Sequence, residues 1–322
     1  MKYFLIFAIL GLVIFFYIKI STYFNIVDQP NSRSSHIEVT VRGGGIIFPI
    51  GALIWFLLSD FQYPFFFLGL TIISLISFWD DIKQLSFQTR LVFQFGAILL
   101  LFSEVGFLQY PWWIWILFFM VATAIINAFN FMDGINGITG AYSLSVLTGL
   151  WLINVYKQNF IENEFLYFIA ISLVVFCFFN FRNKAICFAG DVGSISIAFI
   201  LIFLISKLVI QTGNLLFLLL ISVYGIDSML TIVNRIWNNE NIFVPHRKHL
   251  YQLMANELRI PHIIVASIYS ILQLTIIFVI CLVLNDRSSN LKIWITGIII
   301  LIFLVLIFTI ARNKIKIAQV KQ

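Results

Sequence analysis

Charged residues are scarce in this sequence. Asp, Glu, Lys and Arg make up 11% of the 322 residues, whereas 61% are hydrophobic and 36 are phenylalanine. Soluble globular domains average about 25% charged and about 45–50% apolar residues, so an ordinary soluble enzyme is excluded. A membrane-spanning helix takes roughly 20 residues, so this length accommodates about ten or eleven spans and leaves no room for a separate soluble domain.

Cysteine is also scarce. Cys177 and Cys281 lie inside apolar runs, and Cys187 lies in a short loop. This odd number and spacing exclude a disulfide framework and a paired thiolate metal site. A small-residue cleavage site is absent after the first apolar run, so we expect that run to be retained as a span. Basic stretches with interleaved aromatic residues are absent too, so the net charge of +6 does not indicate a nucleic acid partner.

Apolar runs of spanning length are abundant. They predict an all-α, polytopic integral membrane protein of about 11 transmembrane helices, with ten as the alternative count. We expect a single transmembrane domain over residues 1–322. The predicted spans cover residues 3–20, 43–59, 64–79, 91–103, 111–128, 138–156, 165–180, 193–210, 214–233, 262–284 and 293–311.

The positions of the basic residues predict an orientation. Eleven spans place the two termini on opposite sides of the membrane, and loops rich in Lys and Arg favour the cytoplasm. If the loops after the odd-numbered spans are cytoplasmic, only five of the 20 basic residues lie on the outer side, namely Lys2, Lys157, Lys207, Arg287 and Lys292. We therefore predict a periplasmic N-terminus and a cytoplasmic C-terminus.

The remaining polar residues also gather on the predicted cytoplasmic side. They lie in loops at approximately 21–42, 80–90, 129–137, 181–192 and 234–261, whereas the outer loops are short. Ionisable residues are costly at membrane depth, so several of them on one face predict a polar site between helix ends.

Four aspartates stand at the ends of apolar runs, and they are Asp80, Asp81, Asp133 and Asp191. Carboxylate and amide oxygens together with substrate phosphates suit Mg²⁺, and no set of His and Cys suits zinc. The alternative is that these residues only cap helices or form ordinary turns. The adjacent pair Asp80 and Asp81 repel one another, so one could act as a base while the other faces Mg²⁺.

Basic residues in the same loops suit phosphate. Arg90 stands at the mouth of a span, where it could bind a membrane-embedded phosphate or only anchor the interface. The segment His246–His249 could bind pyrophosphate and donate protons, or it could be a solvated basic loop. Asp227 and Arg235, near the end of a span, could shape the site, form a buried pair or anchor the interface.

Together these segments resemble the polyprenyl-phosphate N-acetylhexosamine-1-phosphate transferase family, of the glycosyltransferase family 4 type. Members of this family start bacterial cell-wall, teichoic acid and O-antigen synthesis. The resemblance covers residues 28–252 and is closest to the O-antigen branch, because the run of three histidines usual in the cell-wall branch is absent. Val41 stands where a proline is common. The motifs are DQPNSRSSH at 28–36, TVRGGG at 40–45, DD at 80–81, NAFNFMDGING at 127–137, GDVGS at 190–194 and HRKHLYQ at 246–252.

The resemblance implies roles for individual residues. Asp191 and Asn130 would hold Mg²⁺, or Mn²⁺ in its place. Asp80, Asp81 and His249 would be catalytic. Residues implied to bind the substrates, including the uridine and the diphosphate, are Arg90, Asn127, Asp133, Gly134, Ile135, Asn136, Phe188, His246, Arg247, Arg42 and His36.

The resemblance also implies an activity. The protein would transfer an N-acetylhexosamine-1-phosphate (GlcNAc, FucNAc, QuiNAc or similar) from a UDP-sugar to undecaprenyl phosphate and release UMP. It would lie in the bacterial inner membrane, with its active site facing the cytoplasm and with a homodimer as an open alternative.

Two rival classes fit the sequence less well. A polyprenyl-lipid transporter or flippase predicts polar residues at mid-membrane depth and on both faces. A CDP-alcohol phosphotransferase needs further aspartates at set spacing, and Asp133-Gly134 has no such continuation.

Overall fold

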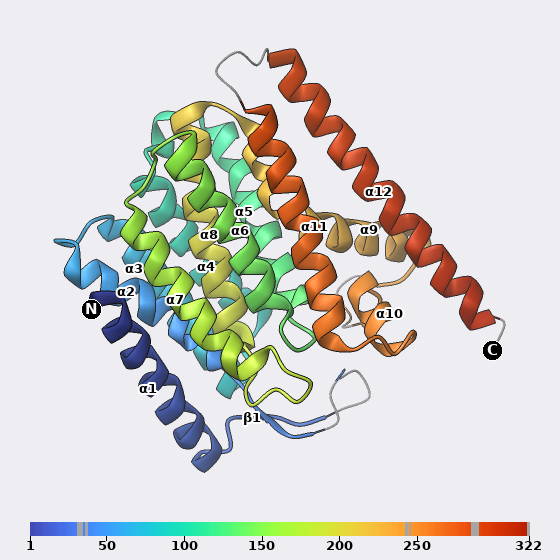
Figure 1. The fold of residues 1–322 in the computed structure, drawn as a ribbon, viewed down its shortest axis with the longest axis horizontal. Helices are drawn as coiled ribbons and strands as arrows, with labels where there is room; N and C mark the ends of the chain where they lie inside the picture. The colour runs from blue at the N-terminus through green and yellow to red at the C-terminus, as the bar shows by residue number, and fades with distance from the viewer. Residues whose placement is uncertain (31–34, 36–37, 242–243, 245, 285–289, 321–322) are drawn as a thin grey trace.

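The computed structural model describes the whole chain except residues 31–34, 36–37, 242–243, 245, 285–289 and 321–322 (Figure 1). The predicted helical fold is confirmed, because each of the eleven predicted runs is largely helical, although the run at 214–233 begins as a 3-10 helix, Leu215–Ile221. The long helices are α1 (Lys2–Tyr23), α3 (Pro64–Ile82), α4 (Phe87–Glu104), α5 (Trp112–Met132), α6 (Ile138–Tyr156), α7 (Asn163–Asn180), α8 (Gly190–Thr212), α9 (Ser222–Trp237), α11 (His262–Val283) and α12 (Asn290–Val320), with the shorter α2 (Ile47–Leu58) and α10 (Leu250–Asn256).

Nine helical segments of the described chain are long and apolar enough to cross a membrane. The two predicted spans that fall short do so for visible reasons. The run at 43–59 begins as a 3-10 turn, Gly44–Ile46, and gives a shorter apolar helix, Gly44–Leu58. Helix α4 carries Arg90 and Gln94 in its first turns, which lower its apolar content. The chain is therefore a multi-pass membrane protein, and its orientation remains a prediction.

Helix α8 occupies the centre of the bundle. In its apolar window 83% of the residues are buried, against 22% for α1 and 17% for α12. A helix that is apolar on every side is stable only when neighbours cover it, and α8 packs against α3, α5, α6 and α2. Phe66 of α3 stacks on Phe203 of α8, with ring centroids 4.0 Å apart.

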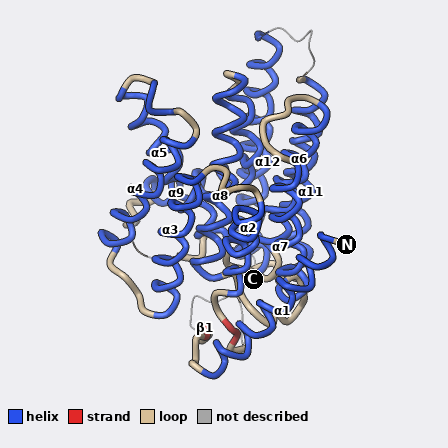
Figure 2. Tube along the Cα trace, turned by 90° about the vertical axis from the view of Figure 1, so that its left-hand side faces the viewer, coloured by secondary structure: helices blue, strands red, loops and turns tan. Residues whose placement is uncertain are grey.

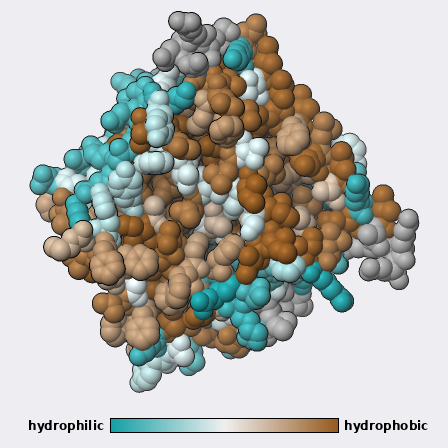
Figure 3. Space-filling model, viewed as in Figure 1, coloured by the Kyte–Doolittle hydropathy of each residue, from teal (hydrophilic) through white to brown (hydrophobic). Residues whose placement is uncertain are grey.

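The outermost helices keep their apolar side chains exposed. Leu12 and Phe16 of α1, and Ile299 and Leu306 of α12, are examples of exposed large hydrophobic residues. Hydrophobic residues also cover most of the face shown in Figure 3. Such a surface suits hydrocarbon and not water, as expected for helices at the rim of a membrane-embedded bundle.

Polar residues lie at both ends of the helix bundle. At one end, Lys2 pairs with Glu164 at 2.7 Å, and the Tyr63 hydroxyl donates to Glu162 at 3.0 Å. Helix α3 begins at this end and finishes at Ile82, so that Asp81 in its last turn lies beside the first residues of α8. The loops predicted to share one face therefore do meet at one end of the bundle, which lies at the bottom of Figure 1.

Several small elements were not predicted, among them the 3-10 helix Phe107–Gln109. Strands β1 (Val27–Asp28) and β2 (Thr40–Val41) form an antiparallel pair, visible at the base of Figure 2, so the fold is helical but not purely so. Val41 also forms a parallel bridge with Cys187. This contact carries Arg42 and the following glycines onto the start of α8. Helix α10 is also unpredicted and lies inside the loop predicted at 234–261.

Candidate active site

Asp81 caps the start of helix α8. Its Oδ1 accepts a hydrogen bond from the backbone N–H of Asp191 at 2.8 Å, and its Oδ2 accepts one from Val192 at 2.9 Å. The first backbone N–H groups of a helix lack intrahelical partners and carry a partial positive charge, so a carboxylate stabilises them. The Asp81 side chain is 0% exposed. It therefore fastens the end of α3 to the beginning of α8 and fixes the position of Asp191.

Arg42 joins two of the carboxylates. Its Nε lies 2.6 Å from Asp81 Oδ1, and its Nη2 lies 2.9 Å from Asp191 Oδ1. Its own carbonyl accepts the Tyr17 hydroxyl of α1 at 2.7 Å. The next residue, Gly43, has a φ of 83°, and a Cβ there would lie 2.2 Å from the Tyr17 oxygen. Only glycine therefore allows the chain to turn here and present Arg42 to both aspartates.

Asp80 points in a different direction from Asp81. Its Oδ1 accepts the Leu85 N–H at 2.6 Å, and its Oδ2 lies 3.0 Å from Nη1 of Arg90, in the first turn of α4. Adjacent helical residues differ by about 100° in direction, which explains the divergence. Asp191 lies near the same guanidinium, with its Oδ2 3.8 Å from Arg90 Nη1. Three carboxylates thus meet two arginines, an excess of negative charge that favours a bound cation.

The loop between α5 and α6 contains four of the predicted site residues. Asp133 accepts the Thr139 hydroxyl at 2.6 Å. Asn136 is buried, and its amide donates to the carbonyls of Arg182 and Asn183, both at 3.0 Å. Asn136 thus ties this loop to the loop before α8. Its amide hydrogens are used within the protein, which leaves the amide oxygen for a ligand.

Burial raises the pKa of the Asp133 carboxyl to about 7, against the opposing effect of the Thr139 hydrogen bond. The folded protein then keeps a proton that the unfolded chain releases at about pH 4. We expect the melting temperature of the wild type, relative to Asp133→Asn, to fall as pH rises from about 5 to about 8. Asp60→Asn, which changes an exposed aspartate, should show no such trend. A melting-temperature difference between the wild type and Asp133→Asn that is constant over this range would contradict a protonated Asp133 carboxyl.

The histidine segment lies against the same loop. The ring centroids of His246 and His249 are 5.0 Å apart, and that of Phe131 lies 6.2 Å from His249. The Tyr251 hydroxyl, in α10, donates to the Phe131 carbonyl at 2.8 Å. A Cβ on Gly134 would lie 2.2 Å from that hydroxyl, so glycine permits the close contact. The structure thus brings the predicted diphosphate motif beside the Asp133 loop.

Both histidines are neutral near pH 7. Burial lowers the pKa of His246 to about 4, with further lowering by the charges of His249, Arg235 and Lys248. Burial also lowers the pKa of His249, although Asp227 acts in the opposite direction. A neutral histidine carries no acidic second proton at neutral pH. The predicted proton donation therefore requires a negatively charged ligand that raises the histidine pKa.

The structure leaves several predicted roles without a test. Asn127 and Asn130 lie three residues apart in the last turns of α5, and both are half-buried. Phe188 contributes its backbone, because its N–H donates to Val41 and its carbonyl accepts from Gly44, both at 2.8 Å. Ile135 and Arg247 are buried and half-buried respectively. His36 lies outside the described residues.

Asn180 is a site residue that the sequence reasoning missed. Its Oδ1 accepts the Gly137 N–H and its Nδ2 donates to the Cys187 carbonyl, both at 2.8 Å. It therefore connects the Asp133 loop to the segment that leads to Asp191. A signal was present, because Asn180 is a polar residue at the end of an apolar run, in the same position as the predicted aspartates.

The arrangement can be tested for a fit to Mg²⁺. Among the described residues, no three His, Cys, Asp or Glu side chains form a ready metal cluster. Mg²⁺ does not need one, since it retains waters and binds through one or two carboxylates plus substrate phosphates. Asp191 Oδ2 is 3.8 Å from Arg90 Nη1, beyond hydrogen-bonding distance. The donor set therefore fits an ion shared with a substrate.

Comparisons with known proteins match the part of the chain that contains the carboxylate cluster. The family model described as glycosyl transferase family 4 matches residues 63–209, which contain both adjacent aspartates and Asp191. The chain is 26% identical over 256 residues to the probable undecaprenyl-phosphate N-acetylglucosaminyl 1-phosphate transferase of Bacillus subtilis, covering 71% of this chain and 70% of that protein. It is 25% identical over 274 residues to the undecaprenyl-phosphate alpha-N-acetylglucosaminyl 1-phosphate transferase of Salmonella typhi, with coverages of 77% and 74%.

The predicted resemblance is thus confirmed at the level of the family, while the O-antigen branch stays a prediction. The family match, the similar relatives and the helical membrane fold agree with one another. The family match and the relatives support the polyprenyl-phosphate N-acetylhexosamine-1-phosphate transferase family for this chain.

Proposed function

We propose that this protein transfers an N-acetylhexosamine-1-phosphate from a UDP-sugar to undecaprenyl phosphate, with release of UMP. One observation carries the proposal. Three carboxylates (Asp80, Asp81 and Asp191) and two arginines (Arg42 and Arg90) from four separate segments converge at one end of an apolar helix bundle. Similar relatives are named as transferases that act on undecaprenyl phosphate.

The two arginines supply contacts for phosphate. The side chains of Arg42 and Arg90 are 33% and 40% exposed, so a ligand can reach both guanidinium groups. Guanidinium groups bind phosphate oxygens in pairs through charge-assisted hydrogen bonds. Both arginines already contact carboxylates, so a phosphate that binds would compete with these carboxylates for the guanidinium groups. A cation that binds with the phosphate would then balance the charge of the carboxylates.

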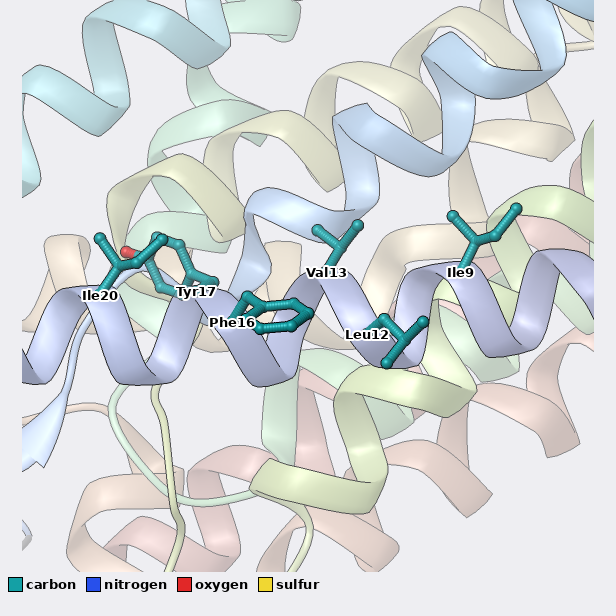
Figure 4. Close-up of a pocket in the computed structure, with 6 residues that line it drawn as sticks. All are labelled: Ile9, Leu12, Val13, Phe16, Tyr17 and Ile20. Atoms are coloured by element: carbon teal, nitrogen blue, oxygen red, sulfur yellow. The ribbon is translucent and has the colours of Figure 1, made fainter.

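The apolar surface beside this cluster suits a lipid. A shallow groove on α1 is lined by Ile9, Leu12, Val13, Phe16, Tyr17 and Ile20 (Figure 4). It reaches Tyr17, whose hydroxyl holds the Arg42 carbonyl. Hydrocarbon surface and phosphate-binding groups are therefore adjacent, as an acceptor with a long chain and a phosphate head requires.

These placements support the following reaction. A phosphate oxygen of the lipid attacks the β-phosphorus of the UDP-sugar, the bond from that phosphorus to the oxygen of UMP breaks, and a lipid-linked sugar diphosphate forms. Asp80, whose side chain is 6% exposed against 0% for Asp81, accepts a proton from the lipid phosphate, while Asp81 holds Asp191 in place. Asp191 and Asn130 would hold Mg²⁺, which would supply positive charge to stabilise the departing UMP. We place this reaction at the cytoplasmic face of the bacterial inner membrane.

The purified protein tests this proposal. With undecaprenyl phosphate, a UDP-N-acetyl sugar and Mg²⁺, we expect equal amounts of UMP and lipid-linked product. UDP-GlcNAc is the first donor to test, followed by UDP-FucNAc and UDP-QuiNAc. An excess of EDTA should reduce turnover at least about 100-fold, because several kcal/mol of charge stabilisation are lost, and added Mg²⁺ or Mn²⁺ should restore it. Absence of UMP with every donor would refute the proposal and would leave a lipid transporter as the alternative.

A further inference from the structure

A second buried carboxylate lies away from the cluster around Asp191. Asp227 of α9 is 0% exposed and belongs to the apolar segment Leu215–Trp237, which is long enough to cross a membrane. An ionised side chain at such a position is costly unless other groups compensate it. Its contacts therefore indicate what it does.

Asp227 holds the start of α10. Its Oδ1 accepts the N–H of Leu250 at 2.8 Å, and its Oδ2 accepts that of Tyr251 at 3.4 Å. These are the two residues that directly follow His249. Because their backbone N–H groups have no partner within the short helix, the carboxylate fixes both the start of α10 and the backbone of His249.

Two further helices reach the same carboxylate. The Tyr269 hydroxyl of α11 donates to Oδ2 at 2.7 Å, and Arg312 Nη2 of α12 lies 3.3 Å from Oδ1. Arg312 Nη2 also donates to the Thr231 hydroxyl at 2.6 Å, and its Nη1 donates to the Leu230 carbonyl at 3.1 Å. The last helix, which is mostly exposed, is thus docked onto α9 at the position that supports the histidine segment.

Arg235 does not join this network. It pairs with Glu240 at 3.3 Å and donates to the Val244 carbonyl at 3.0 Å, so it orders the loop before the histidines. Of the alternatives that the sequence left open, an Asp227–Arg235 pair is therefore wrong, and the partner of Asp227 comes from 85 residues further along the chain.

The His249 ring lies close to Asp227 without bonding to it. His249 Nδ1 is 3.9 Å from Asp227 Oδ1, and within the described part of the chain this buried nitrogen makes no hydrogen bond of normal geometry, although the His249 side chain faces the backbone N–H of Gln252 in a capping box. A shift of less than about 1 Å would give an Nδ1–H to carboxylate hydrogen bond. That bond would fix the tautomer and leave Nε2 available to a ligand.

We propose that Asp227, supported by Arg312 and Tyr269, is a positioning residue that orients His249 toward the diphosphate of the donor. The claim that Asp227 orients the His249 ring does not depend on the proposed reaction. The claim that the ring is oriented toward the diphosphate rests on the function proposed above. Neither Asp227 nor Arg312 falls within residues 63–209, which match the family model.

The imidazole itself provides a readout that does not depend on turnover. The sequence contains four histidines, so ¹⁵N-histidine spectra are simple, and the His249→Ala variant identifies the signal of His249. In the wild type we expect Nδ1 to carry the proton. Charged and titratable groups that act on the ring are Asp227, Arg312, Arg235, His246 and Tyr251. Asp227→Asn should lower the pKa of His249, and Arg312→Gln should raise it.

These opposite shifts separate positioning from a general loss of structure. Lys316→Gln, an exposed change on the same helix, should leave the His249 signal unchanged. If both variants move the His249 pKa in the same direction, or not at all, the proposal is overturned even when turnover is normal. Conversely, the expected shifts in a protein that releases no UMP would uphold the orientation and refute the proposed reaction.

Turnover then tests the purpose of the orientation. We expect Asp227→Asn to lower kcat about 10- to 100-fold, the range found when a residue that orients another ligand is replaced. In a His249→Ala background, Asp227→Asn should have no further effect on kcat, because the group it orients is gone. Additive losses in the double variant would show that Asp227 acts on the fold alone and would overturn the proposal.

Discussion

Asp191→Asn is expected to reduce UMP release about 100- to 1000-fold, the loss typical when one preorganised charged contact to the transition state is removed. The change removes the carboxylate that Arg42 and Arg90 face and that would hold Mg²⁺. Asparagine has nearly the same shape, and the backbone N–H of residue 191 keeps its hydrogen bond to Asp81. The melting temperature should therefore change little while turnover is nearly lost, and the UMP assay and a thermal melt measure the two effects separately.

Asp60→Asn provides the matched control. It makes the same chemical change at an exposed position at the opposite end of α3, and we expect wild-type turnover. Turnover of Asp191→Asn within about threefold of the wild type would contradict the assignment of Asp191 to the reacting centre. A large drop in melting temperature would instead show that the carboxylate is mainly structural.

Arg42→Met should destabilise the protein and abolish turnover. It leaves Asp81 and Asp191 without their common cation, and Asp81 is fully buried. Removal of one partner of a buried ion pair costs about 3–5 kcal/mol, and we expect the lower end because the Arg42 side chain is a third exposed. Thermal or denaturant unfolding in detergent measures this loss, and the Tyr17 hydrogen bond to the backbone carbonyl is unaffected.

A double variant identifies the cause of this loss. In an Asp81→Asn background, Arg42→Met should cost clearly less than it does alone, because the buried charge that it leaves unpaired is absent. Lys83→Met, which removes an exposed cation near the same helix end, should be nearly neutral. Equal costs of Arg42→Met in both backgrounds would show that Arg42 stabilises the fold by packing and not by charge.

Most helices could be predicted because the information is local. Within a membrane, an apolar run of about 20 residues can satisfy its backbone hydrogen bonds only as a helix. The runs at 3–20 and 193–210 could therefore form only helices. The run at 43–59 differed, because three glycines at its start permit a 3-10 turn and the close approach of Gly45 to Gly193. Helix α10 has seven residues, and only the capping box of His249 and Gln252 signals it locally, while its contact with Asp227 depends on the tertiary fold.

The residues of the site could be predicted, but the contacts that each of them makes could not. The sequence placed Asp80, Asp81 and Asp191 on one face, yet it could not show that Asp81 caps α8 while Asp80 turns toward Arg90. Those roles depend on which backbone N–H groups lie within 3 Å of each carboxylate. For the same reason Asn136 was predicted as a ligand residue, although its amide hydrogens join two loops.

The sequence by itself determined that this is a membrane protein of many helices with its polar chemistry at one end, because scarcity of charge and the length of apolar runs are properties of the chain. Only the tertiary structure decided which charges meet. Arg42 reaches Asp191 across 149 residues, and Arg312 reaches Asp227 across 85. Hydrogen bonds and ion pairs act over about 3 Å, and the distances between such residues are set by the packing of α8, α9 and α12 and not by their order in the chain.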